Sequence, residues 1–346
     1  MNFASDNTGP AHPAIMQALV AANAGHAASY GGDDLMAQVR ARVRELFEAP
    51  EAAVYLVATG TAANALSLAT LAQPWETIFC ARTAHVHEDE ANAPEFFTGG
   101  AKLTLVDAPD GRMTAERLRA VIAAQEGRGI HSPKRGPVSV TETTETGTTY
   151  GPARLRALLA VARAQGLPVH LDGARLANAL AFSGAAPADL TWRAGVDVAS
   201  LGGTKDGCPG VEIVVLFDPA RGEEFEYRRK RAGHLFSKHR YLSAQALAWL
   251  EGGLWLDLAR RANGAAAHLA GGLRDKGIEI IFPVEANLVF FNAPRALHRH
   301  LMAQGADYHL WGGSLDGPDP DEILAARLAC DWSADEAMIA RFLGLI

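Results

Sequence analysis

Short apolar runs alternate with longer runs rich in Ala, Leu and Arg along the chain as far as Phe217. The short runs have the length and composition of buried strands, and the longer runs have the composition of helices. Strand and helix in turn predict an α/β fold with a mostly parallel central sheet and helices on both faces. The expected strands cover residues 53–59, 76–81, 101–108, 137–141, 168–174, 196–203 and 211–217, and the expected helices cover 61–72, 114–125 and 153–166.

The pattern changes after about Pro219, and a chain of 346 residues exceeds the usual size of one domain. A basic stretch, 226–238, leads into a long helical segment at 241–277. Shorter strands and helices follow, and the stretch 126–137 is expected to be an exposed loop. We therefore expect a large domain at 1–240 and a smaller α+β domain at 241–346.

The charge balance argues against nucleic acid and membranes as partners. A formal net charge of -7 gives no general attraction for phosphate backbones or anionic lipid. The one strongly basic run, YRRKRAG at 227–233, is more typical of a solvated helix face or a subunit contact. We expect a small-molecule substrate.

The cysteines and the N-terminus indicate the compartment. Cys80, Cys208 and Cys330 lie far apart without a CxxC pair, which fits neither a zinc ribbon nor a disulfide framework. The chain shows no basic region followed by an apolar signal, and no apolar run of membrane-spanning length. These features predict an unprocessed cytoplasmic protein.

One candidate anion site lies in the segment VATGTAANAL, where a buried strand ends at Gly60 and Thr61 opens an Ala-rich helix. The free N–H groups and the dipole of a helix N-terminus suit a phosphate. A plain threonine cap after a turn would explain the same residues.

Two further strands deliver a carboxylate and a lysine. The segment PVHLDGARLANA places Asp172 at the carboxyl end of a strand, the edge where open α/β sheets bind ligands. There it could keep the ring nitrogen of pyridoxal 5'-phosphate (PLP) protonated, although an Asp-Gly turn would also explain it. The segment VDVASLGGTKDG places Lys205 after another strand, among small residues that leave room for a planar cofactor. A desolvated lysine amine there could form a Schiff base with an aldehyde.

His85, in CARTAHVHEDE, lies just past the strand ETIFCA, where its ring could stack on such a cofactor. A structural role for His85, with its ring hydrogen-bonded within the protein, is an alternative that explains the sequence equally well. His85 and His87 could also share a metal, but HEDEA lacks the second histidine of the HExxH zinc motif, so we expect no metal.

Two arginines are candidates for gripping an α-carboxylate or a phosphate. Arg175 follows Asp172 by three residues, and Arg327 lies in the alternating strand ILAARLACDW, where a cation should have an anionic partner. A structural salt bridge is the alternative for both.

Together these segments resemble the threonine aldolase branch of the fold-type I PLP enzymes, the β-eliminating lyase group. SDNTG, YGGDD at 30–34, TGTAAN, the histidine after the strand, HLDGAR and GGTK occur in that family's order, from Ser5 to Arg327. The resemblance implies a homodimer or homotetramer with sites at the subunit interface. It also implies a carbon–carbon lyase that cleaves β-hydroxy-α-amino acids, such as threonine, allo-threonine or phenylserine, to glycine and an aldehyde.

The resemblance further assigns roles to individual residues. Lys205 would bond covalently to PLP, Asp172 would pair with the pyridine nitrogen, and His85 would stack on the ring. Phosphate and substrate contacts would come from Gly60, Thr61, Ser5, Tyr30, Arg175 and Arg327, with Lys238 or Arg231 reaching a phosphate across a dimer interface.

One segment departs from the family pattern. Many relatives have a histidine in a segment like ENTHNG, whereas ETTETG here places Glu145 at that position. The base that accepts the β-hydroxyl proton could be His85, Glu145 or a water held by either. The alternatives to an aldolase are transamination or β-elimination with the same Lys205 and Asp172, or a non-catalytic binding protein of the same fold. A dehydrogenase is disfavoured because the chain contains no GxGxxG.

Overall fold

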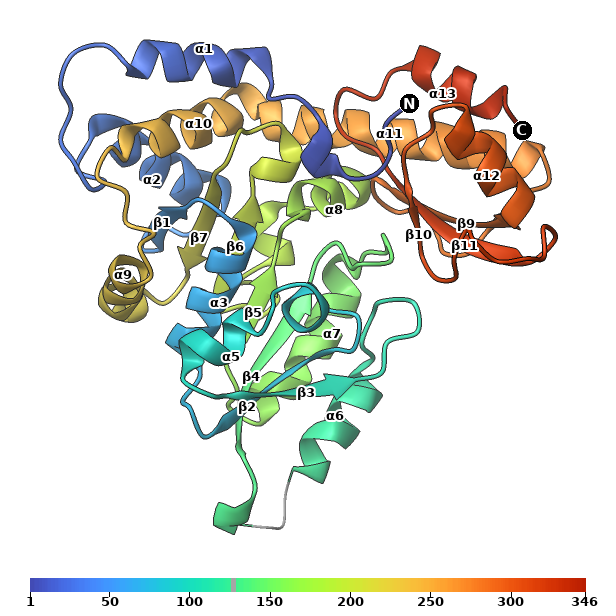
Figure 1. The fold of residues 1–346 in the computed structure, drawn as a ribbon. Helices are drawn as coiled ribbons and strands as arrows, with labels where there is room; N and C mark the ends of the chain where they lie inside the picture. Colours follow the sequence, from blue (N-terminus) through green and yellow to red (C-terminus); the bar gives the residue numbers. More distant parts are fainter. Residues whose placement is uncertain (126–128) are drawn as a thin grey trace.

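The computed structural model describes residues 1–125 and 129–346. Its larger lobe is built around a seven-stranded sheet of order β1-β7-β6-β5-β4-β2-β3 (Figure 1). The neighbours from β3 to β6 pair in parallel, whereas β7 is antiparallel to both β6 and β1. β1 therefore points the same way as the parallel strands, and the predicted mostly parallel sheet is confirmed. The strands are β1 (Ala53–Val57), β2 (Glu76–Ala81), β3 (Lys102–Val106), β4 (Lys134–Thr141), β5 (Val169–Asp172), β6 (Val198–Gly202) and β7 (Glu212–Leu216).

Helices pack on both faces of this sheet (Figure 1). The most enclosed is α3, in which every residue from Ala62 to Leu71 is buried, as befits a helix of small and apolar residues without a charged side chain. The helices of this part are α1 (Pro13–Ala22), α2 (Asp34–Leu46), α3 (Gly60–Leu71), α4 (His85–Glu88), α5 (Ala93–Thr98), α6 (Ala115–Ala124), α7 (Gly151–Ala164), α8 (Leu176–Ser183), α9 (Gly222–Arg231), α10 (Arg240–Leu250) and α11 (Leu254–Asp275).

The C-terminal lobe has a four-stranded antiparallel sheet of order β10-β11-β9-β8. It confirms the smaller α+β part of the predicted fold class. Its elements are β8 (Glu279–Ile280), β9 (Leu288–Pro294), α12 (Arg295–Ala303), β10 (His309–Leu310), β11 (Ile323–Ala329) and α13 (Glu336–Leu343).

The N-terminal segment, residues 1–12, joins the two lobes. Phe3 is fully buried in the C-terminal core, and its N–H donates to the carbonyl of Asp307 (2.8 Å). At the other end of the segment, the His12 N–H donates to the carbonyl of Gly207 (2.8 Å) in the large lobe.

The two hydrophobic cores meet within α11. Side chains up to Ala259 belong to the core of the large lobe, and those from Ala265 belong to the C-terminal core. The division of the chain into domains at 1–240 and 241–346 stays a prediction, and this packing favours a division further along the chain.

Two predicted elements differ in the structure. The helical segment expected at 241–277 is two helices, because Gly252 and Gly253 take φ values of 60° and 78° and turn the chain between α10 and α11. The loop expected at 126–137 contains residues 126–128, which lie outside the described residues, and β4 already begins at Lys134.

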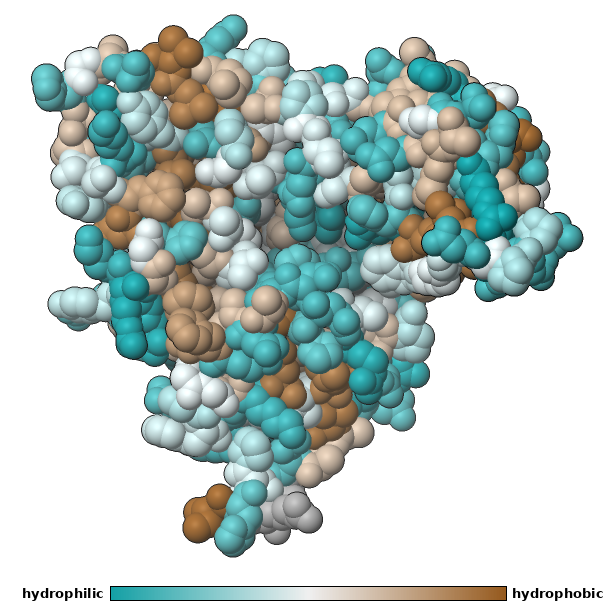
Figure 2. Space-filling model, in the orientation of Figure 1, coloured by the Kyte–Doolittle hydropathy of each residue, from teal (hydrophilic) through white to brown (hydrophobic). Residues whose placement is uncertain are grey.

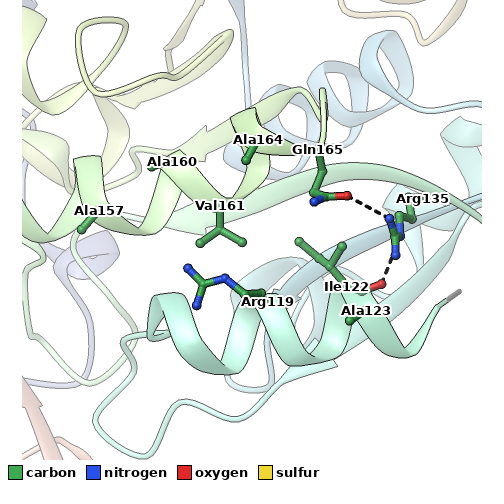
Figure 3. A pocket seen from close by; sticks show the side chains of 9 residues that line it. All are labelled: Arg119, Ile122, Ala123, Arg135, Ala157, Ala160, Val161, Ala164 and Gln165. Carbon is green, nitrogen blue, oxygen red and sulfur yellow. Dashed lines mark hydrogen bonds between the residues drawn. The ribbon is translucent and has the colours of Figure 1, made fainter.

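Beside this loop, α6 and α7 are joined through one arginine (Figure 3). Arg135 donates from Nε to the carbonyl of Ile122 in α6 (3.1 Å), and from Nη1 to the side chain of Gln165, which caps α7 (2.9 Å).

The surface shown in Figure 2 has hydrophilic residues near its centre, where the two lobes meet. Within the described part of the chain, no helix combines the length and the apolar character needed to cross a membrane.

Candidate active site

The carboxyl ends of the parallel strands meet at one edge of the large sheet, where a pocket opens. Its empty volume, including the part open to solvent, is about 800 Å³. Each of five strands, β1, β2, β4, β5 and β6, is followed by residues that line it. The lining residues are Asn7, Ala58, Thr59, Gly60, Thr61, Asn64, His85, Glu145, Asp172, Ala174, Thr204, Lys205 and Glu212.

Lys205 lies in a short 3-10 helix (Thr204–Asp206) directly after β6. A hydrogen bond to α10 holds this turn in place: the buried Asp206 carboxylate accepts from Trp249 Nε1 (2.9 Å). The Lys205 amine makes no hydrogen bond or ion pair with any residue that the structure describes. Lys205 also lines the pocket.

The glycines before Lys205 serve backbone packing. A Cβ on Gly202 would lie 2.2 Å from the carbonyl oxygen of Ala174, so no larger residue fits there. The small residues, predicted to leave room for a cofactor, thus also let the end of β6 approach the turn after Asp172.

Asp172 ends β5 and is 2% exposed. Its two oxygens accept from the Asn64 side-chain amide (3.0 Å) and from the Ala174 N–H (3.1 Å). Asn64 is itself oriented by Ser200, whose hydroxyl donates to the amide oxygen (3.0 Å). These contacts fix the direction of the carboxylate in a buried site. Asn64 lies within the TGTAAN segment, and the sequence did not predict this contact.

His85 opens α4 and is held by a buried carboxylate. Its Nδ1 lies 2.9 Å from Glu90 Oε1, and the same oxygen accepts from the Asn64 amide (2.9 Å). The hydrogen bond to Glu90 raises the pKa of the imidazole, and the nearby Asp172 raises it further.

In the described part of the chain, no group of three or more candidate ligand side chains could hold a metal ion.

The first turn of α3 faces the pocket through Gly60 and Thr61. The Thr59 hydroxyl caps the helix by accepting from the Ala62 N–H (3.2 Å). The N–H groups of the first turn have no partner within the helix, and a Cβ on Gly60 would meet open space. The pocket thus contains a helix N-terminus suited to an anion.

Two glutamates complete the pocket. Glu145 comes from the loop after β4, and Glu212 is the first residue of β7. Because β7 runs against its neighbours, it begins at the edge where the parallel strands end. Burial raises the pKa of the Glu212 carboxyl to about 7, and Thr204 and Lys205 offset part of the rise. Glu212 was not identified from the sequence. The feature that could have revealed it is a charged residue at the start of an otherwise apolar strand.

The predicted carboxylate-binding residues lie beside the pocket. Arg175 forms a two-pronged ion pair with Asp6, from Nε to Oδ2 (2.6 Å) and from Nη2 to Oδ1 (3.1 Å), and both side chains are buried. Asp6 lies within the SDNTG segment, and the sequence did not predict its pairing with Arg175. Ser5 caps the turn that carries Asp6, since its hydroxyl accepts from the Asn7 N–H (3.1 Å).

Arg327 differs from Arg175. Its Nη2 donates to the Ala4 carbonyl (3.2 Å), its Nε is buried without a partner, and among the described residues it has no ion pair. Its guanidinium lies 5.7 Å from the Trp311 ring centre. Burial and the nearby Arg175 lower its pKa.

Three predicted residues lie away from this pocket. Tyr30 is 49% exposed and lies beside Lys230, whose amine is 4.9 Å from the tyrosine ring centre. Arg231, which ends α9, and Lys238 are both exposed. None of the three lines the pocket that contains Lys205 in the same chain.

The chain is similar to known proteins along most of its length. The family model described as "Beta-eliminating lyase" matches residues 2–296. The chain is 40% identical over 338 residues to the low specificity L-threonine aldolase of Pseudomonas sp. strain NCIMB 10558, covering 97% of this chain and 94% of that protein. It is also 40% identical over 334 residues to the Pseudomonas aeruginosa protein of that name, covering 96% and 93%.

A solved structure, that of Leishmania major threonine aldolase, superposes with a TM-score of 0.92 at 26% identity, covering 99% of this chain and 98% of that one. The match extends through both lobes and the N-terminal segment. The family resemblance of the sequence motifs is confirmed, and the chain belongs to the β-eliminating lyase family.

Proposed function

We propose that this chain is a PLP-dependent carbon–carbon lyase. It would cleave the Cα–Cβ bond of L-threonine, L-allo-threonine or a related β-hydroxy-α-amino acid such as phenylserine, giving glycine and an aldehyde. The observation that carries the proposal is the free amine of Lys205 in one pocket with the fixed carboxylate of Asp172. The family and the names of the Pseudomonas and Leishmania relatives support the same reaction.

The pocket fits PLP in four respects. Lys205 offers an unpaired amine to the aldehyde group of PLP, and Asp172 offers a buried carboxylate to the nitrogen of the PLP ring. The first turn of α3 at Gly60 and Thr61 offers N–H donors to the phosphate, and His85 would lie against the ring. When bound, the cofactor supplies an electron sink for the bond that breaks.

The substrate carboxylate would bind Arg327. A guanidinium with a buried, unpartnered Nε is a donor prepared for an anion, because leaving that group unpaired costs free energy. Ser5 and Arg175 would add contacts beside it. Fixing the carboxylate orients the amino acid, and so decides which bond at Cα lies perpendicular to the cofactor ring.

The β-hydroxyl proton would pass to His85, to Glu145 or to a water held by either. Both side chains line the pocket, and the buried carboxylate of Glu90 holds His85 in place. Their proximity to Asp172 and Lys205 is the support for this role.

Tyr30, Arg231 and Lys238 would act from a neighbouring subunit of a homodimer or homotetramer. Their exposure, away from the pocket of their own chain, is the support for this assignment. We further propose a cytoplasmic location, an amino-acid substrate, and neither nucleic acid nor membrane as a partner.

The decisive test is Lys205→Ala, assayed with L-threonine and a panel of β-hydroxy amino acids. We expect loss of both the visible absorbance of bound PLP and aldehyde release, because no other amine lines the pocket among the described residues. Lys276→Ala, at an exposed position after α11, is the matched control and should keep both. Aldehyde release retained by Lys205→Ala would refute the proposal. Keto acid or ammonia from the wild type would point to transamination or β-elimination instead.

A further inference from the structure

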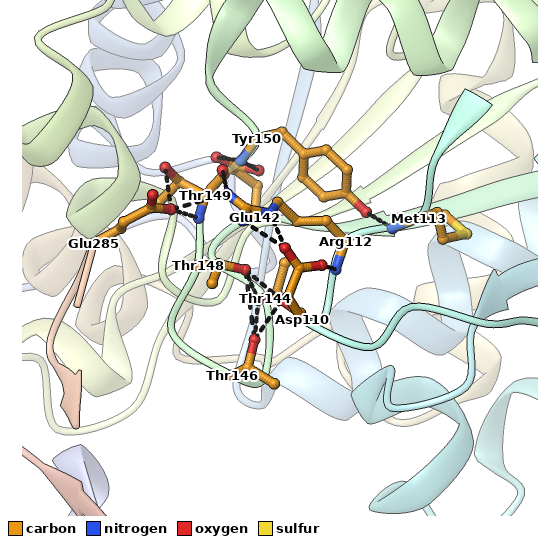
Figure 4. Close-up of polar contacts among 10 residues, drawn as sticks. All are labelled: Asp110, Arg112, Met113, Glu142, Thr144, Thr146, Thr148, Thr149, Tyr150 and Glu285. Carbon is orange, nitrogen blue, oxygen red and sulfur yellow. Dashed lines mark hydrogen bonds and ion pairs between the residues drawn. The ribbon is translucent and has the colours of Figure 1, made fainter. Parts of the chain in front are cut away.

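Glu285, in the C-terminal lobe, contacts the large lobe at two points (Figure 4). Its Oε2 accepts a hydrogen bond from the Thr149 N–H (2.7 Å) and forms an ion pair with Arg112 Nη1 (3.2 Å). The Glu285 side chain is 20% exposed and lies between β8 and β9. One carboxylate therefore connects the C-terminal lobe to two loops of the large lobe.

Arg112 in turn joins these loops to each other. Its Nη1 also donates to the Thr149 carbonyl (3.1 Å), and its Nε donates to the Asp110 carboxylate (2.9 Å). The backbone carbonyl of Asp110 accepts from the hydroxyls of Thr146 and Thr148, each at 2.7 Å. The loop between β3 and α6 thus holds the threonine-rich loop, residues 142–150.

The threonine-rich loop is also closed internally. Both oxygens of the buried Glu142 accept from the Tyr150 N–H (3.1 and 3.0 Å), which joins the two ends of the loop. The Thr144 N–H donates to the Thr148 carbonyl (2.9 Å), so that Glu145 lies in a tight turn between them. The loop is therefore rigid within itself, and its outer contacts determine where the turn lies.

The same loop rests on the C-terminal lobe through Gly147. A Cβ on this residue would lie 3.0 Å from the Cβ of Leu288 in β9, and its φ of 81° is one that glycine adopts readily. Glu285 and Leu288 thus contact the outer side of the loop, and Glu145 extends from it into the pocket.

We propose that Glu285 is a positioning residue that sets the place of Glu145 and, through it, the preference for the substrate side chain. The proposal rests on the proposed function, in which the substituents on Cβ lie near Glu145. The groups that would hold the cofactor and the substrate carboxylate belong to other segments, so a displaced loop should alter discrimination at Cβ more than cofactor binding. Small displacements are costly, because reaction rates fall steeply when a contacting group moves by about 1 Å.

The experiment compares Glu285→Ala and Glu285→Gln with the wild type on L-threonine and L-allo-threonine, measuring kcat and KM separately. We expect the ratio of kcat/KM between the two diastereomers to change about tenfold in Glu285→Ala, with the PLP absorbance unchanged. Glu285→Gln should change it less, because the amide oxygen can still accept from the Thr149 N–H. Glu279→Gln is the matched control: this exposed carboxylate bonds to Asn292 within its own lobe, and the ratio should not move.

A double variant identifies the route of the effect. If Glu285 acts through Glu145, then Glu285→Ala should leave the ratio unchanged in a Glu145→Ala background. The same change in both backgrounds, or no change in the single variants, would overturn the proposal. If Glu285→Ala does not fold, the ratio of kcat/KM between the two diastereomers in Glu285→Gln is the test of the proposal. A wild type that releases no aldehyde would refute the proposed function itself, whereas an active wild type with an unmoved ratio refutes this inference alone.

Discussion

Arg175, just before α8 in the large lobe, and Arg327, in β11 of the C-terminal lobe, have the same chemistry but different surroundings. Arg175 is paired with Asp6 through two hydrogen bonds, from Nε and from Nη2. Arg327 lies near the same aspartate and keeps a buried nitrogen without a partner. An ion pair within the protein indicates a structural contribution, and an unpaired buried cation indicates readiness for an external anion. We therefore expect mutation of the Asp6–Arg175 pair to lower mainly the stability, and mutation of Arg327 to lower mainly the catalytic activity.

The largest expected effect is on stability, in Asp6→Asn. The substitution keeps the size of the side chain and leaves the buried Arg175 without its counter-charge, so the free energy of unfolding should fall by about 3–5 kcal/mol. Urea unfolding, compared with the exposed control Asp307→Asn, measures it. A fall no greater than that of the control would mean that the Asp6–Arg175 pair is not a major structural contact.

The next effect is on catalysis, in Arg327→Gln. Loss of the guanidinium should lower kcat/KM for L-threonine about 100-fold, or about 3 kcal/mol, because a charge-assisted contact with the carboxylate is removed. The free energy of unfolding should change by less than about 1 kcal/mol, since no carboxylate in the described part of the chain pairs with this arginine. Arg299→Gln, exposed on α12, is the control. Unchanged kcat/KM in Arg327→Gln would place the substrate carboxylate elsewhere.

The smallest expected effect is a pH dependence of stability. Burial alone would raise the pKa of the Asp6 carboxyl, but Arg175, together with Lys205 and Asn287, outweighs it and lowers the value from 3.8 to about 2. A carboxyl with a lowered folded-state pKa stabilises the fold above its unfolded value and loses that contribution as the pH falls towards 2. We expect a loss of roughly 2 kcal/mol between pH 5 and pH 2. The free energy of unfolding, measured by urea titration at each pH, should therefore fall more steeply between pH 5 and pH 2 in the wild type than in Asp6→Asn. Equal slopes would contradict the assignment.

The sequence was sufficient for residues at the ends of parallel strands. Gly60, His85 and Lys205 each follow a recognisable apolar strand and Asp172 ends one, and topology requires the carboxyl ends of parallel strands to meet at one edge. Their spacing along the chain was therefore enough to place them in one pocket.

Other parts of the site depend on relations that local patterns do not contain. Glu212 reaches the pocket because β7 is antiparallel, and the composition of a strand does not give its direction. The pair of Asp6 with Arg175 joins residues 169 positions apart, so local patterns could not show that Arg175 has a partner within the chain. The roles of Tyr30 and Lys238 stay predictions, because their proposed partner is a second copy of the chain.

The N-terminal segment has a consequence for synthesis on the ribosome. The amino group of Met1 donates to the carbonyl of Gly305, 304 positions away, and Phe3 pairs with strand β11 through the N–H of Ala329. Residues 1–3 are therefore synthesised about 300 positions before the residues that they contact. Asp6 and Asn7 belong to this segment, so the contacts that hold them beside the pocket form only after strand β11 has been made. Until then the apolar side chain of Phe3 has no core to enter, which leaves the nascent chain open to association with other chains.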